Sequence, residues 1–399
     1  MSSEENPLLT LPKPIVDALF ENAEREAAKA KERILNLRRR LEELKGFFKF
    51  REIKGKRSGR IVVADGSMSV APSRRLGSSF AIYSAGYMVF DGDRLVDEKY
   101  YAGSLSWPHG GVRGFLILLR LLMANAERDA ALEAYWKHSP DLVLLDGPFF
   151  YFRSYCRRIH DVRLGLPELQ TGLDLVRTVR DKTLTLMRTG RAVCVIRRSG
   201  IRAIDGWLTY SRGEEATLGT SDKHLLTMVM PPMSTWSYRE ALGERFYIYS
   251  VFYWFYRHER QRGKTAKELM EDREKLFNQS EMDLKNRFER DLKLDFSKIP
   301  RLERFYVRYS ASAPPFEVEA PSGFNVEEFA EYFVDFHNPV TGLPYPVDLI
   351  DGAVTLPRGA TTMFTEEIEA RLVKDREIAD KTAISQYFTV LNPQKKEYV

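Results

Sequence analysis

Apolar residues recur along the chain with two different spacings, and together they predict alternating helices and strands. From about Ile15 to Leu44, apolar positions follow steps of three and four, which is a heptad seam with charged residues on the other faces. The seam consists of Ala27, Ala30, Ile34, Leu37, Leu41 and Leu44. Such a stripe must be buried, either against the body of the same chain or against a partner chain.

Three strand-like runs follow a basic segment, and short polar turns join them. They are IVVAD (61–65), SSFAIYSAGYMVF (78–90) and LVDEKYYAGSL (95–105), a series typical of an antiparallel meander. A long helix is expected over 111–137, followed by a buried strand in DLVLLDGPF (141–149). A helix over about 173–188 and a strand over 192–198 continue an alternation that indicates strands added in parallel.

Two of these strands end on an aspartate that glycine follows, Asp65 and Asp146. Three antiparallel strands, a helix and then a strand form the order of an RNase H-like core, an α/β fold with a mixed sheet and flanking helices. In that topology the first and fourth strands are neighbours, so the two acids would meet at one edge of the sheet. Each aspartate alone is equally well explained as a turn residue, because Asp-Gly is a strong turn signal.

A glutamate from the intervening helix would complete an acidic cluster. Glu133 is the best placed, and Glu127 is a second option on the far side of the helix. Three carboxylates without a cation repel one another, so they usually surround hard divalent ions such as Mg²⁺ or Mn²⁺. Two such ions about 4 Å apart can activate water and stabilise the leaving oxygen in phosphodiester cleavage, which predicts a nuclease.

The composition is that of an ordinary globular protein. The chain has 399 residues, 44% hydrophobic and 29% charged, enough for one large domain with additions or for two domains. It opens on the polar stretch MSSEENPLLTLPKP, and its longest aromatic run, FYIYSVFYWFY (246–256), is shorter than the roughly 20 residues that cross a bilayer. We therefore expect a cytoplasmic protein without membrane contact. Cys156 and Cys194 lie far apart, so neither a zinc site nor a disulfide is indicated.

Positive charge is concentrated in one part of the chain. Residues 151–202 hold twelve Lys or Arg against four acids, whereas the whole chain has a net charge of only +5. Clustered arginines beside aromatic residues suit phosphate backbones and stacked bases, although a solvated basic face explains the charge equally well. The candidates for contact with DNA are Arg74, Arg75, Arg153, Arg157, Arg158, Arg197 and Arg198.

Several segments, in order, resemble those of the NurA nuclease family. They are VVADGS (62–67), the stretch from Glu133 to DGPF, VIRRSG (195–200), TSDKHLL (220–226), FYVRYS with PPFEVEAP (305–321) and GLPYPVDLID (342–351). The resemblance implies an RNase H-like, metal-dependent DNA nuclease, exonuclease or single-strand endonuclease, that processes DNA ends. It also implies a toroidal homodimer that works with the hexameric HerA-type ATPase and translocase.

Two positions depart from the family pattern. Arg198 stands where the family usually has lysine, and Asp351 stands where it usually has histidine. Aspartate is a sound ligand for a hard cation, and His337 in DFHNP is a nearby alternative. The predicted mechanism has Asp65 bridging two Mn²⁺ or Mg²⁺ ions, Asp146 and Glu133 each holding one, and Asp351 closing the set.

Four segments are expected: an N-terminal helical arm (1–57), the nuclease core (58–240), an aromatic strand with a charged helical insertion (241–300) and a C-terminal part that completes the nuclease domain (301–399). The charged stretch 258–298 exceeds the family pattern and is expected to be either a solvated helical hairpin or a contact to DNA or a partner. Two other functions remain open, a non-catalytic or weakened DNA-binding adaptor of the translocase and an RNA-directed nuclease.

Overall fold

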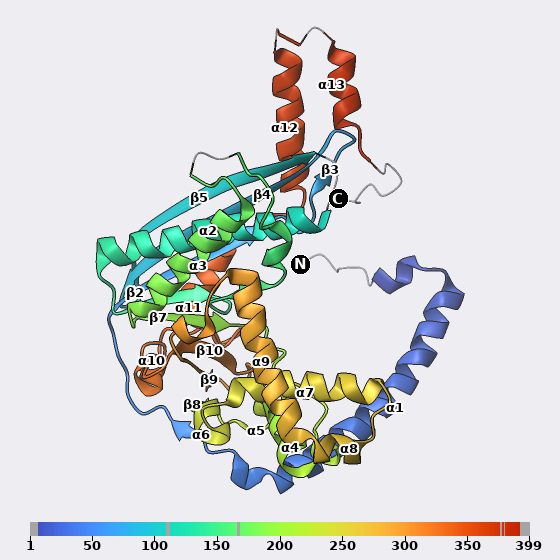
Figure 1. The fold of residues 1–399 in the computed structure, drawn as a ribbon, viewed down its shortest axis with the longest axis vertical. Coiled ribbons are helices and arrows are strands. Elements are labelled where there is room, and N and C mark those ends of the chain that lie inside the picture. Colours follow the sequence, from blue (N-terminus) through green and yellow to red (C-terminus); the bar gives the residue numbers. More distant parts are fainter. Residues whose placement is uncertain (1–6, 109–111, 166–167, 376, 379, 392–399) are drawn as a thin grey trace.

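One ten-stranded sheet organises the molecule. The computed structural model describes residues 7–108, 112–165, 168–375, 377–378 and 380–391 (Figure 1). The strand order is β1-β8-β9-β10-β7-β6-β2-β4-β3, and β5 pairs with β4. The strands are β1 (Arg51–Glu52), β2 (Arg60–Met68), β3 (Ser73–Arg74), β4 (Ser78–Asp91), β5 (Arg94–Pro108), β6 (Leu142–Asp146), β7 (Ala192–Ile196), β8 (Ser234–Ser237), β9 (Leu302–Arg308) and β10 (Phe316–Pro321).

The pairing confirms the expected mixed sheet. Strands β2, β4 and β5 form an antiparallel meander, and β6 lies parallel to β2 with Ile61 opposite Leu142. Strand β7 runs parallel to β6, and β10 pairs antiparallel with β7. The late strands β9 and β10 therefore extend the same sheet that the early strands begin.

Helices cover both faces of the central strands, which explains why those strands are apolar throughout. Val62, Val143 and Cys194 belong to the core beneath α2 and α3, whereas Ile61 and Leu144 belong to the core on the α11 side. The helices are α1 (Lys13–Glu43), α2 (Val112–His138), α3 (Gly172–Arg188), α4 (Ala203–Arg212), α5 (Asp222–Val229), α6 (Tyr238–Leu242), α7 (Phe246–Gln261), α8 (Ala266–Glu271), α9 (Arg273–Leu292), α10 (Val326–Glu331), α11 (Tyr345–Val354), α12 (Ala360–Lys374) and α13 (Lys381–Phe388).

The long N-terminal helix forms as expected, but the body covers only its C-terminal end. Leu41 and Leu44 are buried in a core shared with α4 and α5, whereas Ile34 is 51% and Phe20 58% exposed. Figure 1 shows the N-terminal half of α1 pointing away from the sheet. The N-terminal half of the seam, Ala27, Ala30 and Ile34, is therefore exposed in the described part of this chain.

The aromatic run was expected to form a strand, and this is wrong. It forms helix α7, because Ile248, Phe252 and Tyr256 recur every four residues and so share one helical face. That face packs against Leu269 and Phe277 of the charged insertion, which is helical as expected (α8 and α9). Among the described residues, no helix is long and apolar enough to span a bilayer.

Candidate metal centre

Three carboxylates from distant parts of the sequence meet at one edge of the sheet. Asp65, Asp146 and Asp351 each offer an oxygen, and these oxygens lie within 4.8 Å of one another. Asp65 lies in β2 and Asp146 ends β6, so the parallel pairing of these strands places both acids at the same edge. Asp351 comes from the second turn of α11, which begins at a proline-rich stretch because proline is favoured in the first turn of a helix.

Arg197, directly after β7, binds two of the three acids. Its Nη1 lies 2.7 Å from Oδ2 of Asp351 and its Nε lies 3.2 Å from Oδ1 of Asp146. Its Nη2 also donates to both carboxylates. The hydrogen bond from Arg197 lowers the pKa of Asp351, and the two acids in turn raise the pKa of Arg197. The sequence assigned Arg197 to DNA, whereas its guanidinium faces the acids in this structure.

The cluster contains more acidic groups than positively charged groups. Burial raises the pKa of Asp65 well above its usual value, and the nearby charges of Asp146 and Glu127 raise it further. A hydrogen bond of 2.7 Å from Gly66 N opposes this rise without cancelling it. Burial also raises the pKa of Asp146, although Arg197 lies against it. Such a site is costly to ionise fully unless a further cation is supplied.

Glu133 was predicted to be the third acid of the cluster, and this is wrong. Its side chain lies at the surface, where it accepts from Lys99 Nζ at 2.7 Å and from the hydroxyl of Tyr101. The hydrogen bond from Lys99 lowers the pKa of Glu133. Helix α2 packs its opposite face on the sheet, so Glu133 is directed toward β5 and away from Asp65.

Glu127, the second option on the same helix, lies beside the cluster. Its side chain is 1% exposed. Helix α2 passes close to the residue after Asp65, because a Cβ added to Gly66 would lie 3.5 Å from the Cβ of Glu127. One carboxylate oxygen accepts from Arg128, and the other accepts from Tyr151 Oη at 2.8 Å. The sequence carried a signal for this burial, because Glu127 falls in line with the fully buried Ala124, Ala131 and Ala134.

The chain that follows Asp146 is held on both sides by buried charged groups. Phe149 N donates to Glu319 Oε1 at 2.8 Å, and Phe149 O accepts from Arg128 Nη2 at 3.3 Å. Tyr151, two residues later, binds Glu127. The segment from Asp146 to Tyr151 is therefore fixed relative to both α2 and β10.

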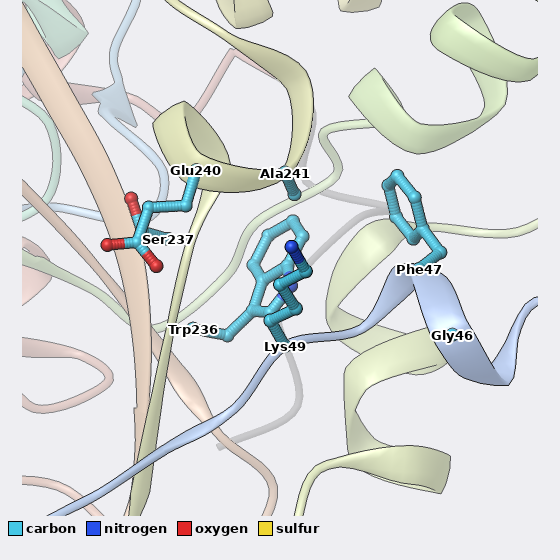
Figure 2. A pocket seen from close by; sticks show the side chains of 7 residues that line it. All are labelled: Gly46, Phe47, Lys49, Trp236, Ser237, Glu240 and Ala241. Atoms are coloured by element: carbon cyan, nitrogen blue, oxygen red, sulfur yellow. The ribbon is translucent and has the colours of Figure 1, made fainter.

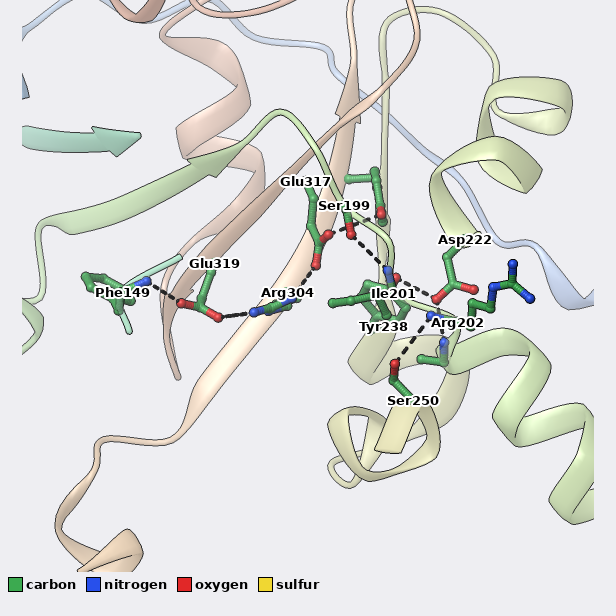
Figure 3. A network of polar contacts seen from close by, with 12 residues as sticks. Phe149, Ser199, Ile201, Arg202, Asp222, Tyr238, Ser250, Arg304, Glu317 and Glu319 are labelled. Carbon is green, nitrogen blue, oxygen red and sulfur yellow. Dashed lines mark hydrogen bonds and ion pairs between the residues drawn. The ribbon is translucent and has the colours of Figure 1, made fainter. Parts of the chain in front are cut away.

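A buried polar network continues from this segment to the loop that follows β7 (Figure 3). Arg304 Nε lies 2.8 Å from Glu319 Oε2, and Arg304 Nη1 lies 2.9 Å from Glu317 Oε1. Tyr306 Oη donates to Glu317 at 3.2 Å. Asp222 accepts from Ala203 N at 2.7 Å, which ties down the start of α4 just after Arg197. The network thus supports the backbone on which both Asp146 and Arg197 are carried.

The remaining basic candidates differ in exposure. Arg74, Arg157, Arg158 and Arg198 are exposed, and the charge of Arg198 contributes to lowering the pKa of Asp351. The sequence was wrong about Arg75 as a DNA contact, because this side chain is 8% exposed and donates to Phe388 O at 3.2 Å. It was also wrong about Arg153, whose guanidinium lies 3.3 Å from Asp291 and packs over the ring of Phe288.

His337 was the alternative ligand for the position of Asp351, and the structure contradicts this. Its Nδ1 is 2.9 Å from Val334 O, and its ring stacks on Tyr309 with centroids 4.8 Å apart. These contacts hold the half-buried side chain against Tyr309, and it is not part of the group formed by the three acids.

A small surface pocket lies elsewhere, between the end of α1 and α6 (Figure 2). It has a volume of about 180 Å³, and Phe47, Lys49, Trp236 and Glu240 line it. Ligand pockets usually reach about 300 Å³ or more, and none of the cluster acids lines this one. The pocket therefore does not belong to the acidic site.

Solved structures share this arrangement of elements. The chain aligns with the NurA nuclease from Sulfolobus solfataricus over 93% of its own length and 100% of that chain, at 14% identity and a TM-score of 0.56. Another NurA structure aligns over 94% and 100% of the two chains at 14% identity, with a TM-score of 0.40. Endonuclease V from Ciona intestinalis aligns over 81% and 96% at 13% identity, with a TM-score of 0.33. These last two scores are too low to support an argument.

No protein-family model matches the sequence, and no curated protein shows significant similarity to it. The likeness to solved structures therefore concerns the fold, since similar folds carry different activities. At that level it confirms the sequence prediction: the chain has the RNase H-like fold of the NurA nuclease.

Proposed function

We propose that the protein is a metal-dependent nuclease that hydrolyses phosphodiester bonds of DNA. The observation that carries the proposal is the group of three carboxylates within 4.8 Å, matched by a single arginine, at the edge of an RNase H-like sheet. Carboxylate oxygens are the ligands that Mg²⁺ and Mn²⁺ prefer, so the donor set fits a hard divalent cation.

The roles of the residues follow from their positions. Asp65, Asp146 and Asp351 would hold the divalent cations, and Glu127, whose charge also acts on Asp65, is a further candidate ligand. Bound divalent ions would activate a water and stabilise the leaving oxygen. Tyr151 and Arg128 orient the Glu127 carboxylate by binding both of its oxygens. Arg197 binds Asp146 and Asp351 in this structure. When these acids bind cations, the guanidinium of Arg197 would be free to bind a substrate phosphate.

The DNA backbone would be held by exposed arginines. Arg198 lies nearest, and Arg74, Arg157 and Arg158 are further candidates. The ring of Tyr155 lies 4.6 Å from the Arg158 guanidinium, which leaves both a cation and an aromatic edge at the surface. Because contacts to phosphate release counterions, affinity for DNA should fall as salt rises.

Exposed apolar side chains on α1 support assembly. Ile15, Phe20 and Leu35 are 48%, 58% and 58% exposed, and a second copy of the chain would bury them. The resemblance in the sequence further implies a hexameric HerA-type translocase as partner. Sedimentation of the wild type and of a Phe20→Glu, Leu35→Glu variant tests the first point, since the variant should be the smaller species.

The function is tested by cleavage of labelled single-stranded and double-stranded DNA with Mn²⁺ or Mg²⁺, with and without a translocase. Cleavage should require the metal and vanish in Asp65→Ala. If wild type and Asp65→Ala behave identically under every condition, the nuclease proposal fails. Glu133→Gln is the matched control, because this acid lies on the same helix as Glu127 but outside the cluster.

A non-catalytic DNA-binding adaptor is the second candidate. It is favoured by the pairing of Arg197 with Asp146 and Asp351, which neutralises part of the acidic charge without a metal. Binding of DNA without cleavage at any metal concentration, in the presence of the translocase as well, would support the adaptor over the nuclease.

A further inference from the structure

An exposed tryptophan lies beside the arginine-rich loop that leaves the acidic cluster. Trp254 of α7 is 53% exposed, whereas its neighbour Tyr253 is 2% exposed and belongs to the interior. The guanidinium carbon of Arg202 lies 5.4 Å from the ring centroids of both residues. Arg202 Nη1 also donates to Tyr253 Oη at 2.9 Å, so the arginine is held in place against the tryptophan.

Arg202 lies only a few residues along the chain from an arginine that acts on the cluster. Arg198, whose charge acts on Asp351, precedes Arg202 by four residues. Four residues span at most roughly 14 Å, even when fully extended. A DNA strand advances about 3.4 Å per nucleotide in the B form and further when stretched, so the backbone from Arg198 to Arg202 spans roughly four nucleotides or fewer.

The chemistry of the patch suits an unpaired base. An indole face provides a stacking surface for any base, and a guanidinium fixed beside it attracts the phosphate that follows. Arg257, one helical turn beyond Trp254, is exposed as well. We propose that Trp254 and Arg202 form a stacking platform for a base of single-stranded DNA, a few nucleotides from the acidic cluster. This rests on the proposed function, because it assumes that the cluster receives DNA.

Binding in the absence of metal tests the platform separately from cleavage. The probe is a fluorescein-labelled 20-nucleotide oligo(dT), titrated with protein in EDTA and followed by fluorescence anisotropy. Trp254→Ala should weaken binding between about 5- and 150-fold, the range that stacking on one aromatic side chain supplies. Trp254→Phe, which keeps an aromatic face, should restore most of the affinity.

Trp136 provides the matched control, because it is 68% exposed but lies near the end of α2, beyond Glu133. Trp136→Ala should bind oligo(dT) as the wild type does. A blunt duplex, whose bases are stacked internally, should bind all three tryptophan variants with nearly wild-type affinity. Melting curves and sedimentation should be unchanged, since the substituted side chains are exposed.

Several outcomes would overturn the platform. They are equal affinities of Trp254→Ala and Trp136→Ala, equal losses on duplex and single strand, a change of oligomeric state in Trp254→Ala, or no binding of oligo(dT) by the wild type. Cleavage that depends on Asp65, together with normal binding by Trp254→Ala, would refute the platform alone. Weakened binding by Trp254→Ala in a protein that never cleaves would refute the nuclease alone.

Discussion

Two acidic clusters lie on the same sheet, and they differ in how their charge is balanced. Glu317 and Glu319 of β10 share Arg304, and their remaining oxygens accept from Tyr306 Oη and Phe149 N. Asp65, Asp146 and Asp351 have one arginine, Arg197, which reaches only the last two. The first cluster has two acids for one arginine, and each of its carboxylate oxygens accepts a hydrogen bond, whereas the second has three acids for one arginine.

Exposure separates the clusters in the same way. The side chains of Glu317 and Glu319 are 0% and 4% exposed, whereas that of Asp351 is 38% exposed. Buried carboxylates whose oxygens all accept hydrogen bonds, and which solvent does not reach, leave no open position for a further ion. An acidic cluster that has more carboxylates than positively charged groups, and that solvent can reach, can bind further cations. The cluster around Arg304 is therefore suited to stabilising the fold, and the three aspartates are suited to binding cations. Substitutions can disrupt each cluster separately.

Asp65→Asn should have the largest effect, and on activity alone. Divalent ions contribute several kcal/mol to phosphodiester cleavage, and about 4 kcal/mol corresponds to roughly a thousandfold loss of rate. Single-turnover cleavage with saturating Mn²⁺ measures the loss. The melting temperature should stay the same or rise, because the substitution removes a buried carboxylate that Asp146 and Glu127 repel. A variant that loses both stability and activity would contradict this separation.

Arg304→Met should have the opposite signature. Removing the shared partner leaves two buried carboxylates uncompensated, which costs about 3–5 kcal/mol of folding free energy. Denaturant unfolding measures the cost. The control is Arg304→Met combined with Glu317→Gln and Glu319→Gln, which removes the charges together and should regain most of the stability. If Arg304→Met alone is as stable as the wild type, the cluster is not the support we describe.

The sequence predicted the sheet edge correctly because strand ends follow from local pattern. Apolar runs that end in Asp-Gly located Asp65 and Asp146, and the order of elements placed them on adjacent parallel strands. Glu127 was placed on the far side of the helix from Glu133, but the wrong side was taken to face the cluster. The helical phase of the apolar stripe, with Glu127 among buried alanines, was the better guide.

Other contacts could not be predicted because they join segments far apart in the sequence. Nothing local indicates that Arg197 binds Asp351, 154 residues later, or that Arg75 donates to Phe388, 313 residues later. The aromatic run 246–256 was ambiguous for a different reason. Aromatic residues favour strands intrinsically, whereas the four-residue spacing of Ile248, Phe252 and Tyr256 and their packing against α8 and α9 favour the helix.

Mn²⁺ should stabilise the wild type but not a variant in which Asp65 and Asp146 are replaced. A ligand that binds only the folded state at 100 times its dissociation constant adds about 2.7 kcal/mol. Thermal unfolding with and without Mn²⁺ should show this gain in the wild type and in Glu133→Gln. The gain should vanish in Asp65→Asn, Asp146→Asn. A gain retained in that double variant would place the metal elsewhere.

Glu127→Gln should reduce activity or metal affinity by about 10- to 100-fold, the usual effect of altering a group beside a metal site. Glutamine keeps the size of the side chain and can still accept from Tyr151, but the buried Arg128 loses its ion pair, so denaturant unfolding must first show that the variant is folded. Calorimetric Mn²⁺ titration and cleavage at several Mn²⁺ concentrations measure it. Glu133→Gln, six residues along the same helix, should be indistinguishable from the wild type.

Arg197→Met should have the smallest effect. It can be compared directly with Arg304→Met, because each substitution removes the arginine of one acidic cluster. Without metal, the variant leaves Asp146 and Asp351 facing each other with no cation, at a cost of about 1–2 kcal/mol because solvent still reaches the pair. Mn²⁺ supplies the missing charge and should restore stability, as measured by denaturant unfolding with and without the ion. In Arg304→Met, whose acids are sealed from solvent, the same ion should restore nothing. Equal rescue of both variants would mean that the two clusters do not differ in their need for a cation.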